Sequence, residues 1–453
     1  MHLHILGLSG TFMSALALLA RASGFQVTGS DAHCYPPVSD LLAANGITWT
    51  DGYENDTQAL KADCVIVGNA MKRGMPVIES VLEAGIAYTS GPQWLAEHIL
   101  PHRRVLAVAG THGKTTTTSM LAHILHQAGL EPGFLIGGVA TDFNTSACLG
   151  KGPWFVIEAD EYDSAFFDKR PKFMHYRPEV AILNNLEFDH ADIYADLGAI
   201  QQQFHYFLKT IPRTGLVIKP RDDAALNDVL ARGQFSRLEE IALSGDATWR
   251  AELLDEAGQS FRVLHKGIRV AEVHWSLIGR FNVENGLAAL AASAFAGVAP
   301  SVAARALAQF SPVKRRLEVK AHRHGIVVYD DFAHHPTAIS KTIQALKQSG
   351  RHQRILVVLE FASYTMRSGV HADLMTHALD GVDAAYLLSP EQFCLADITS
   401  HWSFSYHVLP TTTAIVDAVA ETMQTGDAIL VMSNRGFDNI HQQLVSKMND
   451  RRE

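Results

Sequence analysis

Cysteine is scarce in this chain of 453 residues, and its four cysteines stand far from one another. They are Cys34, Cys64, Cys148 and Cys394, and none belongs to a C-x-x-C pair. A disulfide framework or a zinc knuckle needs cysteines at characteristic close spacings, so this distribution argues against both. We therefore expect reduced thiols and a cytoplasmic protein.

The chain also lacks long apolar runs and an excess of basic residues. The apolar start, Leu3 to Ala20, has no Lys or Arg before it and contains a glycine turn, which favours a strand, turn and helix over a signal peptide. No apolar stretch is long enough to span a bilayer. The formal net charge of −9 argues against a nucleic-acid footprint. We expect neither nucleic acid nor a membrane as a partner.

Two common catalytic signatures are missing as well. The sequence contains no G-x-S-x-G elbow and no H-E-x-x-H motif, so a serine hydrolase of that type and a zinc hydrolase are poorly supported. The 23 histidines are scattered, and most are expected to be structural. The chemistry must come from another kind of site.

That site is predicted around residue 110. An apolar strand, Val105 to Ala109, runs into a glycine turn, a lysine and a block of hydroxyl residues, and Ser119 to His126 continue as a helix. Glycine lets the backbone wrap an anion, the helix N-terminus offers free N–H groups, and the lysine adds a charge. Val108 stands where the usual P-loop has its first glycine, which indicates a shorter variant. The phosphate-binding residues are predicted to be Gly110, Thr111, His112, Gly113, Lys114, Thr115 and Thr116.

The segment before this loop has the pattern of a nucleotide-binding parallel sheet. His2 to Leu6 is a predicted strand, Gly7 to Gly10 a turn, and Thr11 to Ser23 a helix, followed by a strand from Phe25 to Thr28. Asp31 follows that second strand, where an acidic residue either holds a ribose or caps the next turn. From this segment alone the two interpretations are equally good.

Acidic clusters follow two strands of the second segment. Glu158 to Asp163 come after the strand Trp154 to Ile157, and Asn184 to Asp192 come after the strand Val180 to Leu183. The carboxyl ends of parallel strands share one edge of a sheet, so both clusters should lie beside the phosphate loop and offer oxygen ligands to Mg²⁺. The alternative, solvated acidic turns, suits one such cluster better than two.

The chain is expected to form three α/β domains. Residues 1–103 form a Rossmann-like domain, and residues 104–316 form a central P-loop ATP-binding domain with added antiparallel strands between Ala247 and Ile278. Residues 317–453 form a second Rossmann-like domain without a phosphate loop, with a helix starting at Pro336.

These motifs together resemble the Mur ligase family, and the resemblance covers essentially the whole chain. It rests on GLSGTFM and GSD in the first domain, GTHGKTTT, EADEYD, NNLEFDHAD and FNVEN in the second, and RRLE and DDFAHHPT at and after the hinge. Members of the family use ATP to join an amino acid or peptide to a UDP-linked muramoyl carboxylate.

Within the family two acceptors are in question. EADEYD, Tyr35-Pro36-Pro37, the stretch Phe166 to Tyr176 and Leu183 to Leu186 resemble members that attach the recycled murein tripeptide L-alanyl-γ-D-glutamyl-meso-diaminopimelate to UDP-N-acetylmuramate. The alternative is addition of L-alanine in de novo peptidoglycan synthesis. We expect the tripeptide.

The resemblance also implies roles for residues at matching positions, with ATP and Mg²⁺ as cofactors. Lys114 and the loop backbone would hold the phosphates, and Asn282, Arg316 and Asp331 would contact the adenine, the γ-phosphate and the ribose of ATP. Metal ligands would be Thr115, Glu158 and His190, and His334 would act in the third domain. UDP-sugar contacts are assigned to Gly7, Ser9, Gly10, Thr11, Phe12, Ser30 and Asp31.

The residues that bind the acceptor are predicted from its charge. A tripeptide with several carboxylates needs cations, and Arg367 and Arg435 of the third domain can supply bidentate contacts. The alternative is that both are surface residues.

Two other classes remain open. A P-loop kinase or regulatory ATPase forms no amide bond, but it leaves the glycine-turn domain unexplained. A nucleotide-sensing binding module would use the first domain for a dinucleotide, and the incomplete glycine fingerprint counts against NAD.

Overall fold

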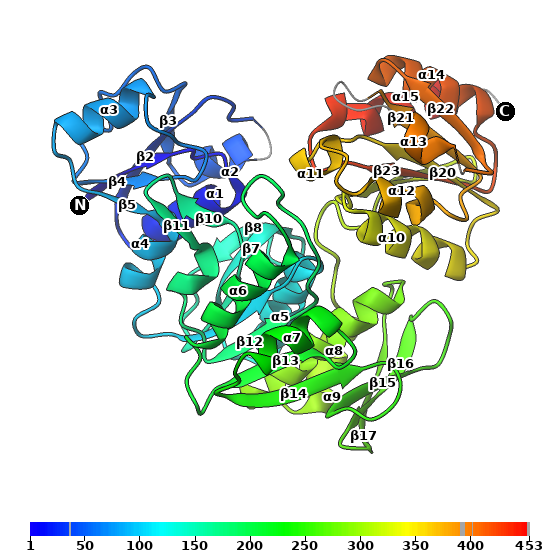
Figure 1. Cartoon of the computed structure of the whole chain (residues 1–453), viewed down its shortest axis with the longest axis horizontal. Coiled ribbons are helices and arrows are strands. Elements are labelled where there is room, and N and C mark those ends of the chain that lie inside the picture. Colours follow the sequence, from blue (N-terminus) through cyan, green and yellow to red (C-terminus); the bar gives the residue numbers. More distant parts are fainter. Residues whose placement is uncertain (36–37, 390–394, 401, 451–453) are drawn as a thin grey trace.

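Three α/β parts follow one another along the chain in the computed structural model, which describes residues 1–35, 38–389, 395–400 and 402–450. Figure 1 shows the blue N-terminal part and the orange-to-red C-terminal part on either side, with the cyan and green central part below them. Each part has its own sheet of five, ten or six strands. The predicted three-domain α/β class is confirmed, and the exact domain boundaries stay a prediction.

The N-terminal sheet is entirely parallel, with the order β3-β2-β1-β4-β5. Strand β2 pairs with one side of β1 and β4 with the other, so the strand order reverses at β1. The turn at Gly7 to Gly10 therefore lies at a topological switch point, where such sheets bind ligands. The expected strand, turn and helix at the start are confirmed, and the second strand continues through Asp31. The elements are β1 (His2–Leu6), α1 (Thr11–Ala22), β2 (Gln26–Asp31), α2 (Val38–Ala44), β3 (Thr48–Asp51), β4 (Cys64–Val67), α3 (Pro76–Glu83), β5 (Tyr88–Ser90) and α4 (Gly91–His98).

The central sheet is mixed, with the order β17-β16-β15-β14-β13-β12-β6-β9-β7-β8. Strand β6, which leads to the phosphate loop, runs parallel between β9 and β12. Both acidic clusters therefore flank the loop, as predicted, and β15, β16 and β17 form the expected antiparallel extension. The elements are β6 (Arg104–Ala109), α5 (Lys114–Gln127), β7 (Gly133–Ala140), β8 (Thr145–Cys148), β9 (Trp154–Glu158), β10 (Asp163–Ala165), β11 (Asp168–Pro171), η1 (Lys172–His175), β12 (Val180–Leu183), α6 (Leu197–Leu208), β13 (Leu216–Pro220), α7 (Ala224–Ala231), β14 (Arg237–Ala242), β15 (Trp249–Leu253), β16 (Ser260–His265), β17 (Ile268–His274), α8 (Arg280–Phe295) and α9 (Pro300–Ala308).

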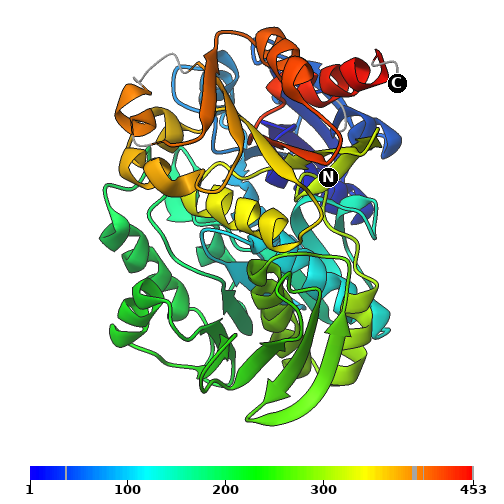
Figure 2. The same cartoon turned by 90° about the vertical axis from the view of Figure 1, so that its right-hand side faces the viewer.

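The C-terminal sheet has the order β18-β19-β23-β20-β21-β22 and is parallel except for β18. Helix α10 begins at the predicted Pro336 and lies on the side of this domain that faces the central domain (Figures 1 and 2). The elements are β18 (Glu318–Arg323), β19 (Ile326–Asp331), α10 (Pro336–Gln348), β20 (Arg354–Leu359), α11 (Tyr364–Arg367), α12 (Ala372–Ala378), β21 (Ala384–Leu388), α13 (Ala396–Thr399), β22 (Ser405–Leu409), α14 (Thr412–Thr422), β23 (Asp427–Met432), η2 (Phe437–Asn439) and α15 (Ile440–Asp450).

The first two domains share a hydrophobic core. One cluster of buried side chains runs from Leu16 of α1 to Leu135 of β7 and Phe155 of β9. The hairpin of β10 and β11 adds a second contact, because the ring of Phe167 lies 5.0 Å from that of Tyr88 in the first domain. The third domain builds two clusters of its own, one of which includes Ile278 of the central domain.

The sequence predicted no membrane-spanning segment and no disulfide framework. Across the described ranges, no helix is both long and apolar enough to cross a membrane. Cys34, Cys64 and Cys148 are free thiols. Cys394, Pro36 and Pro37 lie outside the described residues.

A neutral histidine is built into the first sheet. The His4 ring is fully buried in β1, with Nδ1 2.8 Å from Thr28 Oγ1 and Nε2 3.0 Å from Ser30 Oγ. Burial, with a smaller contribution from His2, lowers the pKa of His4 to about 4. Between its usual pKa and this lowered value, His4 stays neutral in the folded protein, whereas the same histidine takes up a proton in the unfolded chain.

This difference predicts an acid-sensitive first sheet. Between pH 6.5 and 4 the unfolded state binds the extra proton, so the stabilisation present above pH 6.5 is lost as the pH falls, by at most about 1.4 kcal/mol per pH unit. Urea unfolding of the wild type and of His4→Gln at pH 7 and pH 5 should show a shallower pH dependence for the variant. His33→Gln, at an exposed histidine of the same domain, is the control. Equal pH dependence in wild type and His4→Gln would contradict this account.

Candidate active site

The phosphate loop connects β6 to α5 and is held in place from the neighbouring strand. The backbone N–H of His112 donates to Asn185 Oδ1 at 2.7 Å, and that of Thr111 donates to the Asn185 carbonyl at 3.1 Å. Gly113 has φ +80°, and a Cβ there would lie 2.5 Å from Asn285 Oδ1. Only glycine fits this position, so the loop geometry follows directly from the sequence motif.

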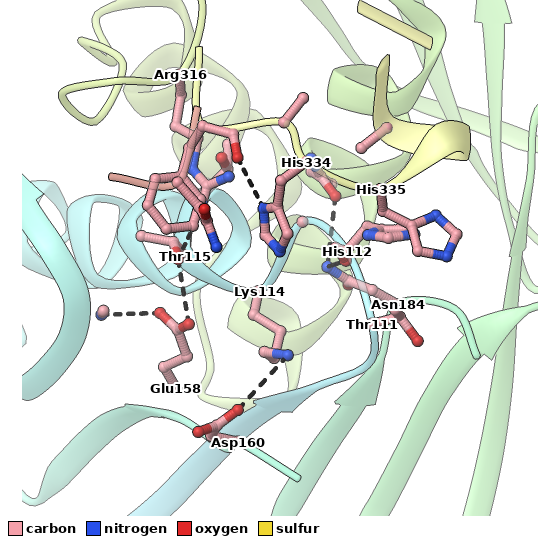
Figure 3. Close-up of a pocket in the computed structure, with 18 of the residues that line it drawn as sticks. Thr111, His112, Lys114, Thr115, Glu158, Asp160, Asn184, Arg316, His334 and His335 are labelled. Atoms are coloured by element: carbon pink, nitrogen blue, oxygen red, sulfur yellow. Dashed lines mark hydrogen bonds and ion pairs between the residues drawn. The ribbon is translucent and has the colours of Figure 1, made fainter. Parts of the chain in front are cut away.

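Lys114 starts α5 and is already neutralised by protein groups. Its Nζ lies 2.7 Å from the Gly110 carbonyl, 2.8 Å from Glu161 Oε2 and 3.8 Å from Asp160 Oδ1. Burial opposes the charge, but Glu161 and Asp160 outweigh it and raise the pKa of Lys114 above its usual value. Figure 3 shows Lys114 and Asp160 pointing toward one another. The lysine is thus a fixed positive charge beneath the loop.

Glu158 stands at the end of β9 on the other side of Lys114. Its carboxylate accepts hydrogen bonds from Thr115 Oγ1 at 3.1 Å and from the Gly137 N–H at 2.8 Å. A Cβ at Gly137 would lie 2.5 Å from Glu158 Oε2, so this approach requires glycine. Burial, only partly offset by Lys114, raises the pKa of Glu158. A hydroxyl and a carboxylate in direct contact are hard oxygen donors, which fit Mg²⁺.

His190 does not contact Glu158, its predicted partner at the metal. Its Nε2 lies 3.2 Å from Glu161 Oε1, and ligand atoms of Asp160, Glu161 and His190 lie within 4.8 Å of one another. Burial opposes protonation, but the hydrogen bond to Glu161 prevails and raises the pKa of His190. The structure thus brings His190 to two acids of the EADEYD run that sequence reasoning did not single out, and the metal role of His190 stays a prediction.

One cavity of about 490 Å³ connects all three domains around this loop. From the third domain and the hinge, Arg316 Nη2 reaches Thr115 Oγ1 at 3.2 Å, while the Asp331 carboxylate accepts the N–H groups of Leu317 and Ala333 at 2.7 and 2.8 Å. Figure 3 shows Arg316 and His334 on the side of the loop opposite Asp160. The predicted ATP-site residues that line this cavity are Thr111, His112, Gly113, Lys114, Thr115, Thr116, Asn282, Arg316 and Asp331; His190, Glu158 and His334 line it too.

The predicted UDP-sugar residues divide into two groups. Gly10, Thr11 and Phe12 line the cavity. Gly7, Ser9, Ser30 and Asp31 are not among its lining residues, nor is Gly110 of the phosphate loop. Asp31 accepts the N–H of Ser9 at 2.8 Å and that of His33 at 3.0 Å, so its carboxylate holds the glycine turn in shape.

The two predicted acceptor arginines also lie away from the cavity lining. Arg367 is half-buried at the end of α11, and Arg435 is exposed after β23. Cations that do line the cavity, besides Lys114 and Arg316, are Lys172 and Lys341. Sequence reasoning missed both, because Lys341 lies in none of the motifs named above and no lysine was singled out in the stretch Phe166 to Tyr176, which contains Lys172.

Glu187 joins the phosphate loop to the third domain. Its Oε2 accepts from Thr337 Oγ1 at 2.6 Å and lies 3.4 Å from His112 Nε2 and 3.5 Å from His335 Nδ1. Despite its burial, these partners, above all His112, lower the pKa of Glu187 to about 2. A charged carboxylate of the NNLEFDH run therefore ties α10 to the loop.

A phosphate loop, flanking carboxylates and a cavity shared by three domains are typical of an ATP-dependent enzyme, and comparison with known proteins identifies its family. Family models of the Mur ligase family, catalytic domain, of the Mur ligase middle domain and of the Mur ligase, glutamate ligase domain match residues 2–103, 108–293 and 315–435. The chain belongs to the Mur ligase family.

Three individual relatives show which members of the family the chain is similar to. The UDP-N-acetylmuramate–L-alanyl-γ-D-glutamyl-meso-2,6-diaminoheptandioate ligase of Haemophilus influenzae is 49% identical over 450 residues, 99% of each chain. A murein peptide ligase from Psychrobacter arcticus, known from its crystal structure, is 44% identical, with a TM-score of 0.77 and full coverage of both chains. The UDP-N-acetylmuramate–L-alanine ligase of Desulforapulum autotrophicum is 30% identical over 464 residues, 98% of each chain.

The geometry predicts that Lys114→Ala abolishes ATP-dependent turnover. The variant removes the one cation inside the loop, and such charge stabilisation is typically worth about 3 kcal/mol or more, roughly a hundredfold in kcat/KM. It also leaves Glu161, whose side chain is 3% exposed, without its main partner. Turnover is measured by phosphate release, and the midpoint of thermal denaturation by fluorescence.

Two further variants separate catalysis from stability. Lys114→Ala/Glu161→Gln should recover thermal stability but not activity, because the uncompensated buried carboxylate is gone. Lys169→Ala, an exposed lysine paired with Asp163, should leave both unchanged. Turnover of Lys114→Ala within about tenfold of wild type would refute the assignment.

Proposed function

We propose that this enzyme uses ATP to join L-alanyl-γ-D-glutamyl-meso-diaminopimelate to the carboxylate of UDP-N-acetylmuramate, in peptidoglycan recycling. The observation that carries the proposal is the single cavity lined by the glycine turn of the first domain, the phosphate loop and the third domain. A reaction that activates one bound acid and joins it to a second molecule needs such a three-sided site. The tripeptide is preferred over L-alanine because two relatives that carry the tripeptide name are 49% identical, whereas L-alanine ligases are 30% to 34% identical.

The reaction has two steps. A carboxylate oxygen of the muramoyl group attacks the γ-phosphorus of ATP, the bond from that phosphorus to the β,γ-bridging oxygen breaks, and ADP leaves. The neutral amine of the peptide then attacks the carbonyl carbon of the acyl phosphate; inorganic phosphate departs with the bond electrons, and the nitrogen loses a proton. Both steps depend on bringing anions together, so positioning and neutralisation supply most of the catalysis.

Residues of the phosphate loop and the hinge would hold ATP. Lys114 and the Gly110–Thr115 backbone are assigned to the β- and γ-phosphates, and Arg316, which already touches Thr115, to the γ-phosphate. Asn282 and Asp331 are assigned to the adenine and the ribose. Burial lowers the pKa of Arg316 somewhat, and Asp331 and Glu158 oppose that effect.

Thr115 would bind a first Mg²⁺, and Glu158 and His190 would bind a second; both ions would neutralise phosphate charge. The oxygens of Thr115 and Glu158 are donors that suit Mg²⁺. Ligand atoms of Asp160 and Glu161 lie within 4.8 Å of that of His190 and would stand beside the second ion.

His334 is placed to serve the amine. Its Nδ1 lies 2.9 Å from the Phe332 carbonyl, which can only accept, so Nδ1 carries the hydrogen and Nε2 has a free lone pair. Burial lowers the pKa of His334, which keeps the ring neutral near pH 7. We assign it to the third-domain side of the site, where it can take a proton from the incoming amine. The peptide itself would lie against that domain, with Arg367 and Arg435 as the assigned cations.

The metal assignment predicts that Glu158→Ala and His190→Ala both lose activity and need more Mg²⁺ for what remains. Phosphate release is titrated with Mg²⁺, and Mn²⁺ binding is followed by electron paramagnetic resonance. Asp163→Asn, in the same acidic run but paired with Lys169, should behave as wild type. An unchanged Mg²⁺ titration with lower thermal stability in His190→Ala would remove His190 from the metal site.

The acceptor assignment predicts a clear preference in kcat/KM for the tripeptide over free L-alanine with the same UDP-sugar. The physical reason is that a tripeptide carries additional carboxylates, and each can gain a charge-assisted contact in the third domain. Phosphate release with each amine, at saturating ATP and UDP-N-acetylmuramate, measures the preference. A higher kcat/KM for L-alanine would assign the chain to alanine addition instead.

A further inference from the structure

Lys172 is a second buried lysine beside the phosphate site. Its side chain, on the short helix η1, is 10% exposed, and its Nζ lies 2.5 Å from Asp160 Oδ2. The other oxygen of the same carboxylate lies 3.8 Å from Lys114 Nζ. Asp160 therefore sits between two ammonium groups, of which only Lys114 belongs to the phosphate loop.

The position of Lys172 is on the first-domain side of the cavity. Helix η1 follows the hairpin of β10 and β11 and contacts α4 of the first domain. Ser164 of that hairpin, and Thr11 and Phe12 of the first domain, line the same cavity as Lys172. The remaining lining cations outside the loop, Arg316 and Lys341, come from the hinge and from α10. Lys172 is thus a lining cation on an element that packs against the first domain.

We infer that Lys172 binds the reacting carboxylate of UDP-N-acetylmuramate, an inference that rests on the proposed function and deepens it. That carboxylate must approach the γ-phosphate from the first-domain side, since the UDP part is assigned to the glycine turn. Two anions approaching one another need a cation at the nucleophile as well as at the phosphate. Lys114 serves the phosphate, and Lys172 serves the carboxylate.

Asp160 supports this role in two ways. Its own carboxylate, lying against both lysines, shows that the space between them accepts this group. The contact of its Oδ2 with Lys172 Nζ also holds the Lys172 side chain beside the cavity that both residues line, where the ammonium group can share its donors with substrate.

The consequence is substrate discrimination. UDP-N-acetylglucosamine has the same nucleotide and sugar but lacks the lactyl carboxylate, so a cation aimed at that carboxylate distinguishes the two compounds. Lys172 should contribute to binding of the acid and contribute little to binding of the unsubstituted sugar.

Calorimetric titration of both compounds into wild type, Lys172→Gln, Lys172→Arg and Lys169→Gln tests the inference. Wild type should bind UDP-N-acetylmuramate more tightly than UDP-N-acetylglucosamine. Lys172→Gln should weaken binding of the acid at least tenfold and change binding of UDP-N-acetylglucosamine less than twofold. Lys172→Arg should retain most of the preference. Lys169→Gln, an exposed lysine on the same hairpin, should match wild type.

Kinetics give a second readout. In Lys172→Gln the KM for UDP-N-acetylmuramate should rise while the KM for ATP stays near wild type. If Lys172→Gln fails to fold, Lys172→Gln/Asp160→Asn removes the pair without leaving a buried charge and should lose the same preference. Equal weakening of both sugars, or an unchanged preference, would overturn the role of Lys172. Absence of any preference in the wild type would instead contradict the proposed function.

Discussion

The charges gathered beneath the phosphate loop have to be balanced before any substrate arrives. Lys114 and Lys172 face Glu158, Asp160 and Glu161 within one largely buried region, and His190 lies against two of these acids. A buried charge without a partner is costly, so these oppositely charged side chains hold one another in place. The pKa shifts of Lys114 and Asp160 in opposite directions express this mutual dependence. The site is preorganised for anionic substrates because Lys114 and Lys172 are already held in place by protein carboxylates.

The same requirement explains how the third domain is placed. Glu187 is charged and shares its oxygen with Thr337 of α10, while Asp189 accepts from Thr365 Oγ1 at 3.0 Å. Both acids belong to the run that follows β12, next to the phosphate loop. The position of the third domain is therefore fixed by Glu187 and Asp189, which also border the nucleotide site. Arg316 at the hinge adds a further contact, because it donates a hydrogen bond to Thr115.

Much of this arrangement could be predicted from the sequence, because it depends on backbone. The glycine turn, the order of strand, loop and helix, and the two acidic runs at strand ends follow from local pattern, and the parallel sheet then brings the runs beside the loop. Side-chain pairing could not be predicted in the same way. His190 contacts Glu161 because Glu161 lies against Lys114, whereas the Glu158 carboxylate, three residues earlier, is held by Thr115 and Gly137. Lys172 escaped notice because a one-turn helix after a hairpin has no periodic pattern, and the position of an arginine such as Arg367 depends on packing that no motif encodes.

The core that passes without a break from α1 into the central sheet has a bearing on how such chains can be recombined. Leu16, Leu135 and Phe155 belong to one packed cluster, so a first domain transplanted from a distant homologue must match the surface of β7 and β9 as well as its own interior. The third domain packs mainly on itself, although Ala257 and Ile278 of the central domain belong to one of its two clusters. Polar contacts and the segment around Arg316 add to this link. Exchange of gene segments at that segment therefore separates fewer buried side chains than a cut near residue 103, which divides one large core. In this fold, modularity is a property of the C-terminal end of the chain.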